Sequence, residues 1–326
     1  MKTAIVILNW NGKQLLEQFL PSVMRYSKGA DIYLADNASS DNSIAFVNSQ
    51  FPKIKIIKNT INGGYAKGYN DALKHIDADI FCLLNSDIEV TSNWLAPIIS
   101  EFETTKDTSI IQPKILDYKN KSHFEYAGAG GGFIDKYGYT YCRGRIFNTM
   151  EKDDGQYDDT TSIFWASGAC FFIRKSTFEA LNGFDESYFA HFEEIDLCWR
   201  AFNADFKTKY IGTSTVFHVG GATLNAVNPQ KTYLNFRNSL FTITKNANGI
   251  LFGIILMRLT LDGIAGLKLL FSFKFAHFMA ILKAHFSFYA HLPRLLKARK
   301  QLPKKKGYYT IYSIVWLYFI KKKLTF

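Results

Sequence analysis

Three polar residues, Asn85, Ser86 and Asp87, directly follow the apolar run of residues 81–84. An apolar run bounded by turn-forming residues is typical of a parallel strand that is covered on both faces. The polar residues would then lie at the carboxyl end of the strand, the edge at which open α/β sheets bind ligands. The Asp87 carboxylate could supply a hard oxygen ligand to a divalent cation, which could hold a diphosphate. The alternative is an ordinary polar turn after a core strand.

Two earlier clusters repeat this placement. Asn9 and Asn11 follow the apolar run of residues 3–8, and Asp36 follows the run of residues 31–35. An aspartate after the second strand could accept a hydrogen bond from a base or a ribose, as in dinucleotide-binding folds. Alternatively, Asp36 only caps the next helix. The sequence has no GxGxxG after the first strand and no GxxxxGK[ST], which disfavours a Rossmann dehydrogenase and a P-loop enzyme.

Strands and helices are expected to alternate through the first part of the chain. The expected strands are residues 3–8, 31–35, 54–58, 79–84 and 109–113. The expected helices are residues 13–26, a segment from about residue 42, and residues 65–75 and 94–102. This alternation favours a parallel sheet with right-handed crossovers, so the polar clusters should meet along one edge of the sheet.

The later elements are less regular in pattern. Residues 115–160 contain Gly128, Gly130, Gly131 and Gly132 without a following helical pattern, so we expect a hairpin and a mobile loop rather than a phosphate cradle. The further expected strands are residues 163–174, 208–211 and 214–219. The further expected helices are residues 176–181, capped by Ser176, a segment from Glu193 onward, and residues 228–245.

The composition narrows the class of protein. The chain has 326 residues, is 48% hydrophobic and carries a formal net charge of +11, so it is long enough for a sizeable core and favours an anionic partner. Its four cysteines are far apart, with no CxxC pair, which disfavours a zinc site or a disulfide framework. We therefore expect a reducing, cytoplasmic location.

The C-terminal segment differs from the rest of the chain. It has no Asp or Glu after Asp262, while lysines and arginines alternate with aromatic and aliphatic residues up to Lys321-Lys322-Lys323. A spanning helix needs about 20 mostly apolar residues, and no window here is that apolar. The pattern favours helices that lie on an anionic membrane surface; the alternative is ordinary packing with solvated lysines. No nucleic-acid reader motif occurs, so no nucleic acid is expected as partner.

The polar clusters together resemble a known family. The matching segments are Val6–Gly12 (VILNWNG), Ala35–Asp41 (ADNASSD), Asn62–Asn70 (NGGYAKGYN) and Leu84–Asp87 (LNSD). In this order they look like the family 2 glycosyltransferases, with the closest match in the rhamnosyltransferase-like branch of bacterial surface polysaccharide biosynthesis. The resemblance covers roughly residues 3–245. It implies a GT-A fold, with a Rossmann-like, mostly parallel central sheet and helices on both faces.

The resemblance also implies a donor site. A nucleoside-diphosphate sugar would bind across the strand ends, with Mg²⁺ or Mn²⁺ on its diphosphate. Asp87 would be the metal-binding acid of the family's DxD motif, whose first acid is replaced here by Asn85, and His218 resembles a late histidine that completes the metal site. The implied substrate-binding residues are Asn9, Asn11, Asp36, Asn62, Gly64, Lys67, Asn70, Asn85, Ser86, Gly168 and Arg237.

Family 2 enzymes invert the anomeric configuration, so a base must take the proton of the acceptor hydroxyl. The family's base lies in a Phe-Glu-Asp-x-Asp-Leu segment, which here reads Phe192-Glu193-Glu194-Ile195-Asp196-Leu197. We predict Glu194 as the base, with Glu193 as the alternative. Asp196 is predicted to position a neighbour such as Arg200, because residues two apart do not share a helix face.

These expectations combine into one prediction. Residues 1–246 would form the glycosyltransferase domain, with a nucleotide-binding half (1–113) and an acceptor-binding half (114–246). Residues 247–326 would form a helical membrane-surface region at the cytoplasmic face of the inner membrane. The predicted activity is metal-dependent, inverting transfer of a hexosyl group to a glycan or lipid-linked acceptor, with rhamnose as a candidate for the transferred sugar. The alternatives are a nucleotidyltransferase that makes a nucleotide sugar, and a non-enzymatic membrane-surface binding module.

Overall fold

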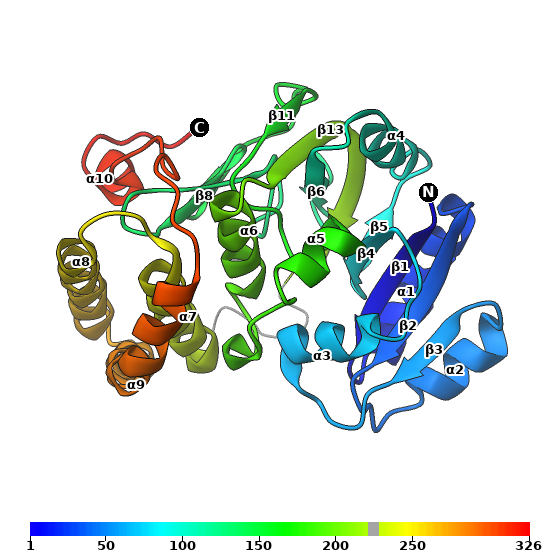
Figure 1. The fold of residues 1–326 in the computed structure, drawn as a ribbon, viewed down its shortest axis with the longest axis horizontal. Coiled ribbons are helices and arrows are strands. Elements are labelled where there is room, and N and C mark those ends of the chain that lie inside the picture. The colour runs from blue at the N-terminus through cyan, green and yellow to red at the C-terminus, as the bar shows by residue number, and fades with distance from the viewer. Residues whose placement is uncertain (221–227) are drawn as a thin grey trace.

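The computed structural model describes residues 1–220 and 228–326 and is built around a mixed central sheet (Figure 1). Its main path follows the order β11-β13-β6-β12-β4-β1-β2-β3, and β5 pairs with β13. The strands that run parallel to one another are β1 (Thr3–Asn9), β2 (Ala30–Asp36), β3 (Lys55–Lys58), β4 (Ile80–Asn85), β6 (Thr108–Asp117) and β13 (Lys207–His218). The antiparallel strands are β5 (Ile88–Val90), β11 (Thr160–Ser162) and β12 (Cys170–Arg174). The predicted mostly parallel α/β sheet is confirmed.

Helices cover both faces of this sheet because alternate strand residues point to opposite sides. In β1, Ala4 and Val6 enter one hydrophobic core, while Ile5 and Ile7 enter the other. The helices that pack into the core containing Ile5 are α1 (Lys13–Tyr26), α2 (Ser43–Gln50) and α4 (Ala96–Thr104). The helices that pack into the core containing Ala4 are α3 (Gly64–Leu73), α5 (Lys175–Ala180) and α6 (Glu193–Asn203).

A smaller antiparallel sheet replaces the hairpin and loop expected within residues 115–160. Its strands are β7 (Gly132–Ile134), β8 (Thr140–Cys142), β9 (Arg145–Ile146) and β10 (Thr149–Met150). Close packing explains its glycines, because a Cβ at Gly132 would overlap the Trp165 ring. The sheet buries Tyr141 and Ile146 against Ile314, so the end of the chain folds back onto it.

Three predicted strands were wrong in extent. Residues 163–169 are not part of a strand: Cys170 donates its backbone N–H to the Ser167 carbonyl at 3.3 Å, which closes a turn, and only Cys170–Arg174 pairs in the sheet. The two short strands expected within residues 208–219 are instead one strand, β13, with a break in register between Ile211 and Thr215. The predicted Ser176 cap was also wrong, because α5 begins at Lys175 without a side-chain cap.

The C-terminal helices form a layer at the end of the molecule away from β3 and α2 (Figure 1). They are α7 (Pro229–Asn246), α8 (Leu251–Phe271), α9 (Phe275–Gln301) and the short α10 (Ile314–Phe319). Leu240 and Phe241 of α7 pack with Phe288 and Leu295 of α9 in a core of their own. Within the described part of the chain, every helix is too short or too polar to span a bilayer.

Candidate active site

The ends of β1 and β2 bring the first two polar clusters together. Asn9 lies opposite Asp36 in the parallel register, and its Nδ2 donates to Asp36 Oδ1 at 3.0 Å. Asp36 Oδ2 in turn accepts the backbone N–H of Ser39 at 2.9 Å. Asn11 Oδ1 accepts the N–H of Ser40 at 2.7 Å, so its amide holds the loop after β2. Asn9, Asn11 and Asp36 therefore form one connected edge, as expected for strand ends.

Asn62 and Gly64 join this edge at the start of α3. The Asn62 Oδ1 atom accepts from Asn37 Nδ2 and from the Gly64 backbone N–H, both at 3.0 Å. Gly64 adopts φ +76°, and a Cβ at this position would overlap the carbonyl oxygen of Phe189. Because that carbonyl also accepts the N–H of Tyr65 at 2.8 Å, the start of α3 is fixed to the segment before α6.

Lys67 and Asn70 lie further along α3 and contact a turn rather than the strand ends. Asn70 donates from Nδ2 to the Phe184 carbonyl and accepts the Phe184 N–H at Oδ1, both at 2.9 Å. Lys67 forms ion pairs with Asp71 at 2.8 Å and Glu186 at 3.7 Å. Both side chains thus hold the turn around Phe184 in this structure.

Asp87 and His218, the two predicted metal ligands, are brought into contact although they are far apart in sequence. His218 ends β13, which pairs antiparallel with β5 immediately after Asp87. The Nε2 atom of His218 lies 3.2 Å from Asp87 Oδ1, and both side chains are buried. A third residue, Glu125, places Oε2 3.3 Å from His218 Nδ1. Sequence reasoning missed Glu125, because it lies within the segment of residues 115–160 that has no clear periodicity.

The contacts within this trio shift the pKa values of His218 and Asp87 in opposite directions. Burial disfavours the imidazolium, but Glu125 and Asp87 outweigh it and raise the pKa of His218 to about 10. Burial would also raise the pKa of Asp87, but the contact with His218 lowers it below its usual value. Without a cation, the ring is therefore protonated between two carboxylates at neutral pH.

The Asp87–His218 pair fits a divalent cation in geometry and chemistry. Two ligands at about 2.1 Å from a cation and at right angles lie roughly 3 Å apart, close to the observed 3.2 Å between Oδ1 and Nε2. A carboxylate with an imidazole suits Mn²⁺ or Mg²⁺. No group of three or more His, Cys, Asp or Glu side chains is arranged to hold a metal in residues 1–220 and 228–326. Other ligands would have to come from substrate phosphates or water.

Asn85 and Ser86 are half-buried and directly precede Asp87 in the chain. The backbone N–H of Asn85 donates to the Ala169 carbonyl at 3.0 Å. The neighbouring Gly168 carbonyl accepts from Tyr65 Oη at 2.9 Å. The turn at residues 167–169, which contains Gly168, therefore connects the end of β4 to α3.

Glu193, which is buried, and Glu194, which is half-buried, begin α6 close to this turn. The Oε2 atom of each is buried without a hydrogen-bond partner among the described residues. Burial raises the pKa of Glu194 to about 7, opposed by the backbone amides of Glu194, Ile195 and Gly168. Burial, and then the neighbouring Glu194, raise the pKa of Glu193 well above its usual value. The Gly168 amide near Glu194 links the acidic pair to the turn beside Asn85.

The chain before these acids has an unusual backbone. Phe189, His191 and Phe192 have φ values of 63°, 67° and 72°, in the left-handed region that non-glycine residues rarely occupy. Such conformations persist only where surrounding structure fixes them, and they concentrate at functional sites. Here the side-chain amide of Asn238 donates to the carbonyls of Ala190 at 2.9 Å and His191 at 2.7 Å. The segment therefore fixes where α6 starts and where its acids point.

Asp196 and Arg237 serve the packing of this segment in the structure. Asp196 is fully buried and pairs with Arg200 Nε at 2.8 Å, the predicted neighbour, and with Lys245 Nζ at 2.9 Å. Arg237 donates to the carbonyls of Ser187 and Tyr188, both at 3.1 Å. Neither side chain contacts the Asp87–His218 pair in any recorded interaction of the described residues.

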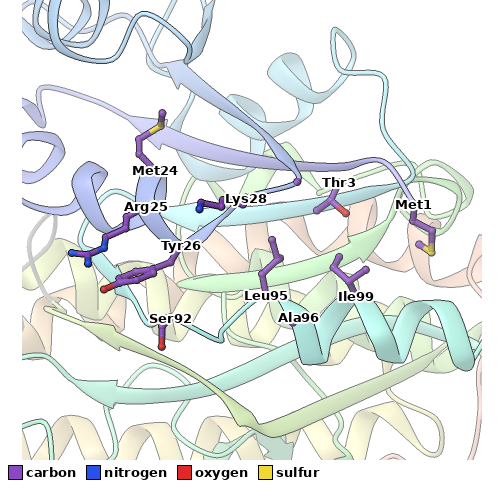
Figure 2. Close-up of a pocket in the computed structure, with 11 residues that line it drawn as sticks. Met1, Thr3, Met24, Arg25, Tyr26, Lys28, Ser92, Leu95, Ala96 and Ile99 are labelled. Atoms are coloured by element: carbon purple, nitrogen blue, oxygen red, sulfur yellow. The ribbon is translucent and has the colours of Figure 1, made fainter.

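A cavity of about 730 Å³ lies at the opposite edge of the sheet, beside the start of β1 (Figure 2). Its lining includes Thr3, Arg25, Lys28 and Leu95. It has no carboxylate in its lining and lies at the amino ends of the strands, whereas ligands of such sheets bind at the carboxyl ends. The strand-end cluster is therefore the better candidate for chemistry.

Two solved structures share the fold. GalNAc-T7 with UDP, GalNAc and Mn²⁺ aligns with a TM-score of 0.57 at 16% identity over 75% of this chain and 48% of its own. The mannosyltransferase PcManGT from Pyrobaculum calidifontis, in complex with GDP-Man and Mn²⁺, aligns with a TM-score of 0.55 at 11% identity over 90% of this chain and 75% of its own. At these identities the likeness establishes a GT-A fold.

The sequence also matches named proteins. The N-acetylglucosaminyl-diphospho-decaprenol L-rhamnosyltransferase of Mycobacterium tuberculosis (strain CDC 1551 / Oshkosh) is 23% identical over 233 residues, which cover 66% of this chain and 75% of the relative. The profile of Glycosyl transferase family 2 matches residues 4–181, more than half of the chain and including the ends of β1, β2 and β4. The match extends over the strand ends that hold Asn9, Asp36 and Asp87, and the chain is therefore a member of glycosyl transferase family 2.

Proposed function

We propose that this family 2 glycosyltransferase transfers a sugar, with inversion, from a nucleoside diphosphate to a hydroxyl group of a glycan or lipid-linked acceptor. One observation carries the proposal. The Asp87–His218 pair is suited to a cation-bound diphosphate, and the Glu193–Glu194 pair is suited to proton transfer. Both border the same strand-end region through the turn at residues 167–169. A nucleotide-binding half (1–113) and an acceptor-binding half (114–246) are part of this proposal.

Donor binding would use the connected edge of β1 and β2. Asp36, held by Asn9, offers carboxylate oxygens to the base or ribose, and Asn11, Asn62 and Gly64 shape the loops beside it. Asn85 and Ser86 would contact the ribose or the sugar. Lys67, Asn70 and Arg237 would act through the turn around residues 184–188, which they hold.

Asp87 and His218 would hold Mg²⁺ or Mn²⁺, which supplies charge neutralisation to the diphosphate leaving group when bound. Asp87 and His218 would keep that diphosphate at the end of β4. Glu194 would take the proton from the acceptor hydroxyl as its oxygen bonds to the anomeric carbon and the bond from that carbon to the diphosphate oxygen breaks. Glu193 lies beside it with a pKa raised well above its usual value, so a second negative charge in the pocket is disfavoured.

The acceptor and the membrane form the finer part of the proposal. The mycobacterial relative is named for a decaprenol-linked acceptor and for rhamnose, which favours rhamnosyl transfer to a lipid-linked glycan in cell-envelope polysaccharide synthesis. Such an acceptor lies at a bilayer surface. Residues 247–326 carry most of the exposed large hydrophobic side chains of the described chain, interspersed with lysines. We place the enzyme peripherally on an anionic membrane, at the cytoplasmic face of the inner membrane.

A transfer assay tests the proposal. Purified protein with a panel of labelled nucleotide sugars, Mn²⁺ and membrane lipid extract should release the nucleoside diphosphate and label the lipid fraction. The Asp87→Asn and Glu194→Gln variants should each lose at least about 100-fold in rate, the scale of lost acid–base or charge stabilisation. Glu179→Gln, on the exposed side of α5, should retain full activity.

Two results would contradict the proposal. Full activity of the Asp87→Asn, Glu194→Gln double variant would show that neither the Asp87–His218 pair nor the Glu193–Glu194 pair is needed for the reaction. Release of pyrophosphate from a nucleoside triphosphate and a sugar phosphate, without sugar transfer, would identify a nucleotidyltransferase instead.

A further inference from the structure

The His218 ring lies between two carboxylates, and only one of them is accounted for by the proposed cation site. Its Nε2 faces Asp87 Oδ1 at 3.2 Å, and its Nδ1 faces Glu125 Oε2 at 3.3 Å. The two nitrogens are on different sides of the ring, so a cation beside Asp87 would use Nε2 and leave Nδ1 to Glu125. The Glu125 side chain is 8% exposed, so its carboxylate was removed from water to reach this position.

The protein fixes Glu125 and His218 independently of each other. The Glu125 backbone N–H donates to the Ile115 carbonyl at 3.1 Å, and its Oε2 accepts the backbone N–H of Ala127. The backbone of Gly220, at φ +68°, passes so close that a Cβ there would lie 2.8 Å from Glu125 Oε1. His218 is fixed by its register with Ile88 of β5 and by the Tyr118 N–H, which donates to its carbonyl at 2.9 Å.

We propose that Glu125 is a positioning residue that makes His218 a ligand of the divalent cation through Nε2. In this structure Nδ1 is buried without an aligned hydrogen bond to any described residue, and Glu125 Oε2, 3.3 Å away, is the acceptor that faces it. By accepting a hydrogen bond from Nδ1–H when the cation is bound, the carboxylate would select the neutral tautomer whose Nε2 lone pair points toward Asp87. It also holds the ring plane and increases the basicity of the ligating nitrogen. This role depends on the cation site of the proposed function.

The geometry explains why a carboxylate is needed at this place. Without an acceptor at Nδ1, the proton can move to Nε2, and the ring then presents an N–H rather than a lone pair to the cation. An amide in place of the carboxylate can turn its NH₂ group toward Nδ1 and favour that wrong tautomer. Loss of such an outer carboxylate typically weakens metal binding about 10- to 100-fold.

The test measures cation binding directly. The electron paramagnetic resonance signal of free Mn²⁺ gives its dissociation constant for the full chain in the presence of UDP. We expect the constant to rise about 10-fold in Glu125→Gln and up to about 100-fold in Glu125→Leu, which has no acceptor. Glu101→Gln is the matched control, because Glu101 of α4 is a partly buried carboxylate paired at 2.7 Å with Lys209, which lies at the opposite end of β13 from His218. It should change the constant less than twofold.

A second readout follows the ring itself. In the ¹⁵N-labelled protein with diamagnetic Mg²⁺ and UDP, long-range ¹⁵N–¹H spectra should show His218 protonated at Nδ1, and Glu125→Gln should reduce that form. A purely structural Glu125 would leave the tautomer and the dissociation constant unchanged in folded variants.

The outcomes separate this role from the cation site. If Asp87→Asn weakens Mn²⁺ binding but both Glu125 variants bind within twofold of the wild type, the role of Glu125 is overturned and the site stands. If Glu125→Leu does not fold, a change of less than twofold in Glu125→Gln is sufficient to overturn it. If the wild-type protein binds no Mn²⁺ with UDP, the cation site and the role of Glu125 are rejected together, while metal-free sugar transfer remains testable.

Discussion

At the scale of single residues, Glu194 has a half-buried side chain, a pKa near neutrality and an Oε2 atom without a hydrogen-bond partner among the described residues. A general base is most effective when its pKa lies near the working pH. Because the base must be deprotonated, the kcat/KM of the wild-type enzyme should increase between pH 6 and pH 8, with a midpoint near the pKa of about 7. Glu194→Gln should lower kcat/KM about 100-fold or more and abolish this rise.

The control for this profile is Glu179→Gln, whose side chain is largely exposed on α5. It should reproduce the wild-type profile. If Glu194→Gln instead keeps the same pH midpoint, with only a lower plateau, another group titrates and the neighbouring Glu193 becomes the candidate base.

The same carboxyl group should make folding stability depend on pH. Its pKa rises from an ordinary 4.5 to about 7 on folding, so between these values the folded state binds a proton that the unfolded state has lost. Stability from this group is therefore present below about pH 4.5 and is lost as the pH rises toward 7. Urea unfolding at pH 5 and pH 8 should show a loss that is greater in the wild type than in Glu194→Gln, by roughly 2 kcal/mol. Equal pH dependence in both proteins would contradict the raised pKa.

At the scale of elements, regular periodicity decided what could be predicted. β1, β2 and β4 alternate between two cores and end in turn-forming polar residues, so their extents and their shared edge followed from the sequence. The turn at residues 167–169 could not be predicted, because Trp165 and Ala166 are as apolar as a strand and are buried by tertiary packing instead. A local sequence pattern does not indicate such packing.

The residues of the candidate site also differ in whether the sequence could predict them. Asp87 and Glu194 stand in recognisable motifs, whereas Glu125 lies in a segment whose glycines and short strands give no periodic signal. Its contact with His218 depends on the pairing of β13 with β5 and β6, which joins residues far apart in sequence. Long-range register of this kind is set by the whole sheet rather than by local residues.

The junction between α3 and the segment before α6 gives a prediction for an element boundary. Gly64 and Gly29 both have positive φ, but a Cβ at Gly29 has open space while one at Gly64 would overlap the Phe189 carbonyl. Gly29→Ala should therefore lose about 1 kcal/mol from the backbone conformation alone. Gly64→Ala should lose about 2–4 kcal/mol and much of its activity, because Phe189 precedes the Glu193–Glu194 pair.

Urea unfolding and initial transfer rates of the two glycine variants measure both effects. The comparison isolates the overlap, since the positive φ is common to the two sites. Equal destabilisation of the two variants, with full activity in Gly64→Ala, would show that α3 and the Phe189 segment are not coupled.

At the scale of the whole molecule, charge and exposed apolar surface are concentrated at one end. No acidic residue follows Asp262 in the sequence, and the turn between α8 and α9 exposes Phe271, Phe273 and Phe275 beside Lys274. Phe271 is 78% exposed and Phe273 is 82% exposed. Aromatic side chains and a lysine at one protruding turn fit the boundary between lipid headgroups and acyl chains.

Replacement of Phe271, Phe273 and Phe275 by serine should therefore release the protein from vesicles with about 30% anionic lipid. Each buried Phe contributes about 1.5–3 kcal/mol, so the apparent dissociation constant should rise at least 100-fold.

Binding of the wild type should also weaken with salt, because its electrostatic part is screened. Flotation of vesicles measures both, with Met150→Ser, an exposed apolar residue on the small sheet, as control. Because the proposed active site lies on the strand-end edge, the triple serine variant should still hydrolyse or transfer from a soluble donor, while transfer to a lipid-embedded acceptor falls. Unchanged vesicle binding of the triple variant would exclude this turn as the membrane contact.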